Sequence, residues 1–240
     1  MSSYGRPQFA FPRLTSTVKA LIIGLLGAYV AQLVLHNWLG VPIASWLAMQ
    51  PASLAVWQLV TYVVIDLGHP LMFLIGLLFI WWALSPFEIA YGPRRTLQLC
   101  LAVTLGASLP AWLMGFVIAG SPVLFGSHVL WFGGITATTW LYRGRQMSLF
   151  GIGSMTGQQF LLVLVGLSVL MFLASKNHTQ LIGDLGAMGS GILFMRWLMR
   201  PRGRSPVGRS RKKGPSARAK GFRVIDGGGS DPDERPKYLN

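Results

Sequence analysis

The sequence is poor in acidic residues, in cysteine and in charged residues of any kind. Only 7 of its 240 residues are Asp or Glu, charged residues make up 12%, and hydrophobic residues make up 52%. A chain this apolar is not typical of a soluble domain and indicates a membrane protein with several spans. The single cysteine, Cys100, excludes an intramolecular disulfide and a cysteine-rich metal site. We expect neither a metal nor a cofactor.

Basic residues are plentiful and are concentrated at the C-terminal end. Of the 21 Lys and Arg residues, 12 lie in 200–240. In a soluble protein this excess would suggest nucleic acid, but on a membrane-attached tail it favours anionic lipid headgroups, at roughly 1 kcal/mol per basic residue. The Arg, Gly, Ser and Pro content predicts that 200–240 is a disordered cytoplasmic tail. A short docking peptide near its end, 222–240, is the alternative interpretation.

The remaining chain predicts an all-α membrane domain, 18–199, preceded by a cytoplasmic arm, 1–17. Its six apolar segments are approximately 18–35, 70–84, 97–118, 123–142, 160–174 and 181–199. The loop 39–68 between the first two carries Trp46, Trp57 and Tyr62, which suit a membrane interface.

The distribution of positive charge predicts the orientation, because cytoplasmic flanks of membrane helices carry the excess of Lys and Arg. Before the tail, one side of the six segments has Arg6, Arg13, Lys19, Arg94, Arg95, Arg143 and Arg145. The other side has only Lys176. Both termini are therefore expected in the cytoplasm, with the bundle in a bacterial inner membrane.

The last apolar segment carries an aspartate, Asp184, among small residues. A carboxylate within hydrocarbon costs roughly 2.5 to 3.5 kcal/mol on insertion scales, so this side chain is expected to face protein. Small residues recur every four positions around it: Gly183, Ala187 and Gly191 on one line, and Gly186 and Ser190 on another. This spacing lets another helix approach closely, and we expect the first line to face the fourth segment, at Gly126, Gly133 and Gly134.

Ser121 and Pro122 have the pattern of a helix start, with the serine at the N-cap and the proline at the first helical position. The alternative is that the Ser121 hydroxyl is a nucleophile, which requires a base within hydrogen-bond reach. His178 is expected at the same depth in the membrane, whereas His128, seven residues after the serine, would be about 10 Å away along a helix. Ser127, also preceded by glycine, is a weaker nucleophile candidate. Glu88, three residues after Ser85, has the capping-box pattern.

Together these segments resemble the rhomboid family of intramembrane serine proteases, over about 18–199. The segment 57–62, WQLVTY, is similar to the family's WRxxTY, and Glu88 with Gly92 and Arg95 is similar to ExxxGxxR. The run 119–126 is similar to GxSGxxxG at the start of the family's fourth helix, and 184–191 to HxGGxxxG in the sixth. The resemblance implies six membrane helices, with Ser121 at the nucleophile position, Asp184 at the base position, and His69 and Phe73 at the oxyanion positions.

Several of these positions depart from the family pattern. Asp184 stands where the family has the histidine that takes the serine proton, and a carboxylate is a weak base toward a serine hydroxyl at neutral pH. Phe73 replaces an asparagine donor, and Pro122 lacks a backbone N–H that an oxyanion could use.

The first hypothesis is therefore a rhomboid-like pseudoprotease that binds transmembrane segments of client proteins. The second is an active intramembrane serine endopeptidase, in which Ser121 uses His178 as a displaced base or uses Asp184 in a perturbed state. A small transporter is disfavoured, because Asp184 and Glu88 are the only candidate ion-coupling acids. The distance between Ser121 and His178 separates the first two hypotheses.

Overall fold

The computed structural model describes residues 12–51, 53–118, 120–142, 146–148 and 154–200, all within the compact unit Met1–Arg200. The predicted tail, with its lipid contacts and docking peptide, lies outside the described residues, as do most of the N-terminal arm, Arg143 and Arg145.

The described chain is mostly helical. Its long helices are α1 (Ser16–Asn37), α4 (Pro70–Tyr91), α5 (Pro93–Met114), α6 (His128–Leu141), α7 (Gly157–Ser175) and α8 (His178–Leu198). The connection after α1 holds three short helices, α2 (Ile43–Leu47), α3 (Gln58–Thr61) and η1 (Tyr62–Val64). A small antiparallel hairpin, β1 (Gln146–Ser148) and β2 (Ser154–Thr156), precedes α7.

Four of these helices, α1, α4, α5 and α7, are long and apolar enough to cross a membrane. The prediction of a helical membrane protein is confirmed at this level. The other two long helices differ from these four: α6 has 14 residues, and α8 has 21 residues but carries Asp184 and Arg196. The count of six spans and the side of each terminus remain predictions.

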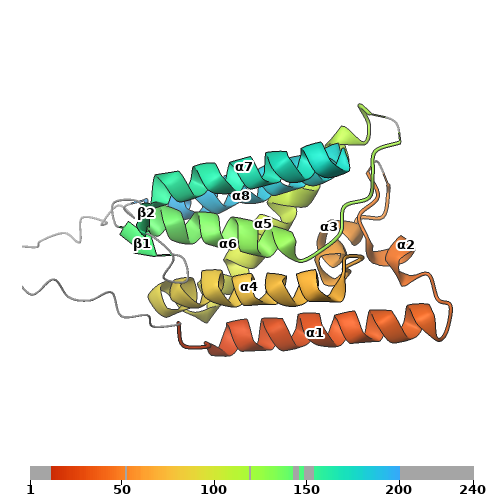
Figure 1. Cartoon of the computed structure of the whole chain (residues 1–240), viewed down its shortest axis with the longest axis horizontal. Coiled ribbons are helices and arrows are strands. Elements are labelled where there is room, and N and C mark those ends of the chain that lie inside the picture. The colour runs from red at the N-terminus through yellow and green to blue at the C-terminus, as the bar shows by residue number, and fades with distance from the viewer. Residues whose placement is uncertain (1–11, 52, 119, 143–145, 149–153, 201–240) are drawn as a thin grey trace, which may run out of the picture. The chain divides into compact units, whose positions relative to one another are not determined.

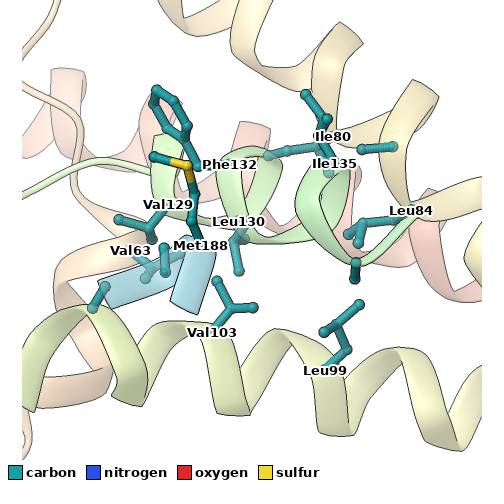
Figure 2. Packing of buried hydrophobic residues seen from close by; sticks show 14 of the residues in the cluster. Val63, Ile80, Leu84, Leu99, Val103, Val129, Leu130, Phe132, Ile135 and Met188 are labelled. Carbon is teal, nitrogen blue, oxygen red and sulfur yellow. The ribbon is translucent and has the colours of Figure 1, made fainter. Parts of the chain in front are cut away.

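The short helix α6 forms the centre of the bundle (Figure 1), with α4 on one side and α7 and α8 on the other. Most of its residues are buried, and Figure 2 shows Leu130 and Ile135 of α6 among residues of α4, α5 and α8. The hydroxyl groups of Thr136 and Thr138 donate to backbone carbonyls one turn earlier, so these buried polar groups are satisfied within the helix.

Helix α8 approaches its neighbours backbone to backbone through its small residues. A Cβ added at Gly191 would lie 2.7 Å from the carbonyl oxygen of Gly133 on α6. A Cβ at Gly186 would collide with the carbonyl oxygen of Gly106 on α5. Ala187, on the same line as Gly191, is fully buried. Gly183, in contrast, lies against the side chain of Leu124, which precedes α6.

Glu88 differs from its predicted role. The capping-box interpretation is wrong, because α4 continues through Ser85 to Tyr91 and no helix begins at Ser85. Instead, the Glu88 carboxylate accepts hydrogen bonds from the N–H groups of Thr17 and Val18 at 3.1 Å each, and from the Thr15 hydroxyl at 2.5 Å. It therefore satisfies the free N–H groups at the start of α1 and places a negative charge at the positive end of that helix.

The close approach of α8 to α5 predicts a position-specific response to one added methyl group. Gly186→Ala should lower the free energy of unfolding by about 1 to 3 kcal/mol, because the new Cβ meets the Gly106 carbonyl. The matched control is Gly189→Ala, where a Cβ meets nothing within 4 Å and where alanine is the better helix former. Thermal unfolding of the purified protein in detergent measures both. Equal stability of the two variants would contradict the backbone contact.

Candidate functional site

Ser121 and His178 lie within hydrogen-bond distance of each other. Ser121 follows α5 in the loop that leads to α6, and His178 is the first residue of α8. The serine Oγ is 3.2 Å from the histidine Nε2, and both side chains are half-buried. His178 is positioned by the start of its helix, where the Asn177 side chain accepts a hydrogen bond from the Gln180 N–H at 3.0 Å.

The same serine hydroxyl also donates to the carbonyl oxygen of Ile118 at 2.7 Å. A hydroxyl has a single proton, so while it donates to Ile118 it can only accept from a protonated Nε2 of His178. To act as a nucleophile, Ser121 has to turn its proton from Ile118 to an unprotonated Nε2. In the observed geometry, Ser121 and His178 therefore connect the loop to α8. They become a reactive pair only after the hydroxyl rotates.

The loop that carries Ser121 is held on two sides. Leu124 exchanges two backbone hydrogen bonds of 2.9 Å with Met49, and its side chain packs over Gly183 of α8. Two residues later, the Gly126 N–H donates to the Tyr62 carbonyl oxygen at 3.1 Å. Gly126 has a φ of +103°, and a Cβ there would be 2.7 Å from His128 Nδ1, so both backbone and space require glycine.

The predicted helix start at Ser121 is wrong. Helix α6 begins at His128, and Ser127 occupies the N-cap position, without a capping hydrogen bond from its side chain. The reason is a long-range contact: Leu124 is paired with Met49 of the first loop, so 121–126 cannot form the first turns of α6. Ser127 is buried. The fourth-helix start, where the resemblance places a nucleophile, thus holds Ser127, and Ser121 lies six residues earlier.

Asp184 is paired with a residue to which the sequence did not assign this role. Its Oδ1 lies 3.1 Å from His128 Nε2, and its side chain is 1% exposed against 19% for the histidine. The angle is poor for a hydrogen bond, and in the described part of the chain neither carboxylate oxygen has a hydrogen-bond partner. His128 is the first residue of α6, so this contact connects the start of α6 to α8. A buried acid needs a partner. The one histidine in the apolar segment 123–142, His128, was the signal in the sequence that could have predicted it.

Tyr62 is a buried residue of the first loop that contacts the bundle. Its hydroxyl donates to the Thr104 carbonyl oxygen of α5 at 2.9 Å. Burial raises the pKa of the phenol, and the Asp184 charge raises it further, so Tyr62 stays protonated and remains a donor. The neighbouring Gln58 is also buried and donates to the Trp46 carbonyl oxygen at 3.2 Å. These hydrogen bonds hold the first loop in place, and through Met49 and Tyr62 it in turn holds the loop that carries Ser121.

His69 and Phe73, which the resemblance places at oxyanion positions, differ in their surroundings. His69 is the exposed N-cap of α4. Phe73 is buried and stacks on Tyr29 of α1, with ring centroids 4.2 Å apart, so it serves helix packing. Within the described ranges, no hydrogen bond joins either residue to Ser121, and no three His, Cys, Asp or Glu side chains come together as a metal site.

The buried pair of His128 and Asp184 predicts a strong and reciprocal effect on stability. His128→Phe leaves the buried carboxylate without a partner and should cost about 3 to 5 kcal/mol of unfolding free energy. The double variant His128→Phe, Asp184→Leu removes both polar side chains and should recover most of this loss. His36→Phe, at an exposed histidine of α1, is the control and should change stability by less than about 0.5 kcal/mol. Additive losses in the double variant would contradict the pairing.

Comparison with known proteins does not assign the chain to a group. No protein-family model matches it, and no match is found among curated proteins.

Proposed function

We propose that this chain is a rhomboid-like membrane protein with six spans, both termini in the cytoplasm, and a bacterial inner membrane as its location. The proposal is supported by the order of the motifs and by the six long helices that coincide with the six apolar segments. It is also supported by the ordered first loop, in which Gln58 and Tyr62 of the WRxxTY-like segment are buried contacts of the bundle. The short α6 and the charged α8 cross the bilayer because neighbouring helices cover them.

Its function in this proposal is to bind transmembrane segments of client proteins without cutting them. The observation that carries this is the pairing of Asp184 with His128. The position where the family keeps its base is occupied by a fully buried carboxylate that faces another helix. A carboxylate that lies 3.1 Å from an imidazole and is turned toward another helix is poorly placed to accept a serine proton.

The other catalytic positions support the same conclusion. Phe73 packs against Tyr29 instead of offering an N–H donor, and Pro122 has no backbone N–H beside Ser121. Loss of one oxyanion donor costs about 100- to 1000-fold in rate. The outward apolar surfaces of α1, α4 and α7 are where a client helix could lie, since Ile23, Leu74 and Leu170 are each more than half exposed.

A second candidate function, intramembrane serine hydrolysis, is favoured by one specific observation. His178 Nε2 is 3.2 Å from Ser121 Oγ, within the reach that a general base requires. In this alternative the Ser121 proton moves to Nε2 while Oγ attacks a carbonyl carbon, whose π electrons move onto its oxygen. Nε2 then gives the proton to the leaving amine as the C–N bond breaks, and water releases the acyl group from Oγ. The competing hydrogen bond to Ile118 and the missing oxyanion donors place this alternative second.

Client binding is tested with the full-length protein in nanodiscs. A donor fluorophore on the protein and acceptor-labelled transmembrane peptides report association by energy transfer. We expect saturable transfer for at least one peptide of a natural sequence, well above a Leu-Ala helix of the same length. If every natural peptide behaves as the Leu-Ala helix does, the binding proposal is wrong.

Hydrolysis is tested with a fluorophosphonate probe and a transmembrane model substrate. We expect the wild-type protein to give neither labelling nor cleavage. Labelling that is lost in both Ser121→Ala and His178→Ala, but kept in Ser127→Ala and in the control His36→Ala, would establish the second candidate instead. Labelling lost only in Ser127→Ala would contradict both, and would move the nucleophile to the α6 N-cap.

A further inference from the structure

Arginine and tryptophan side chains stack on one another at the end of the bundle where α5 begins and α8 ends. The Arg95 guanidinium carbon lies 5.3 Å from the ring centroid of Trp197, in the last turn of α8. The adjacent Arg196 lies over Trp140 of α6, with a distance of 6.0 Å. The two stacked pairs involve adjacent residues in the last turn of α8, with one partner each from α5 and α6. We refer to the two pairs together as the cluster.

The charges of this cluster are not neutralised by carboxylates. Among the described residues, no Lys or Arg lies within ion-pair distance of an acid, and the one recorded pair is that of His128 with Asp184. Arg95 uses one guanidinium nitrogen to donate to Gln98 at 3.0 Å. Glu88, at the same end, is engaged by the start of α1. As far as the described residues go, most N–H donors of Arg95 and Arg196 are thus available for an anion.

The stacking also prepares the geometry that a phosphate group requires. A guanidinium is planar, and its edge presents parallel N–H groups that suit bidentate contact with phosphate oxygens. A ring against its face limits rotation without consuming these donors. Trp197 itself is 51% exposed, as expected for a tryptophan at the headgroup level of a bilayer.

Apolar surface adjoins the cluster on α8. Leu193, one turn before Trp197 on the same face of the helix, is 65% exposed. A soluble anion or an acidic peptide would leave this leucine uncovered, whereas the acyl chain of a lipid would cover it. The cations therefore suit the headgroup of a lipid, and the leucine suits its acyl chain.

We propose that Arg95, Arg196 and Trp197 form a binding site for the headgroup of an anionic phospholipid, whose acyl chains lie along Leu193. This site belongs to the folded bundle and is separate from any attraction of the basic tail. It does not depend on whether Ser121 reacts or whether clients bind.

The test uses the full-length protein in nanodiscs of mixed phosphatidylglycerol and phosphatidylcholine at a fixed ratio. Bromine, which quenches tryptophan fluorescence at short range, is placed on the acyl chains of either one lipid or the other at equal mole fraction. The signal of Trp197 is the difference between wild-type protein and Trp197→Phe. We expect brominated phosphatidylglycerol to quench this signal several-fold more than brominated phosphatidylcholine.

The double variant Arg95→Gln, Arg196→Gln should abolish the preference. The control Arg13→Gln, Lys19→Gln removes the same charge from exposed positions at the start of α1 and should keep it. Thermal unfolding in detergent establishes that both double variants are folded. Equal quenching by the two lipids would overturn the proposal, including the case in which an acidic segment of the chain itself fills the site. An equal loss of preference in both double variants would mean that only the general surface charge attracts the lipid.

Discussion

The close contact of α8 with two neighbouring backbones is the constraint on which the bundle depends. Between Gly186 and Gly191, this helix touches the carbonyl of Gly106 on one side and that of Gly133 on the other. In a bilayer, where lipid is as apolar as a leucine side chain, helices associate through such packing and through polar contacts. The fixed position of α8 then decides where His178 and Asp184 lie, because both are carried by its first two turns.

Each acid of the described bundle has a distinct local partner. Glu88 is matched by backbone N–H groups and a hydroxyl, Asp184 by an imidazole, and Asp66 by the Gly68 N–H at 2.8 Å in the first loop. An unpaired charge in an apolar interior costs several kcal/mol, so the partners of the buried Glu88 and Asp184 are requirements of the fold, whereas Asp66 lies in a partly exposed loop. For Asp184 the same pairing is the observation on which the proposed function rests.

The helical membrane class was predictable from the sequence, because long apolar runs with few charges have few other solutions. Helix ends were less predictable. Ser121 with Pro122 has the local pattern of an N-cap, but the long-range pairing of Leu124 with Met49 keeps that segment extended. His178 was expected at the depth of Ser121, and it lies beside it. The partner of Asp184, His128, could not be predicted in this way, because the two residues lie on different helices, α8 and α6. Local patterns do not report contacts between segments that are far apart in sequence.

The bond network of Glu88 has a consequence for the order in which the protein is assembled. The N–H of Val18 and the carboxylate that accepts from it are separated by 70 residues of sequence. The start of α1 can therefore gain this acceptor only once α4 has been synthesised and has packed beside it. A fragment of the chain that ended before Glu88 would leave the N–H groups of Thr17 and Val18 without it.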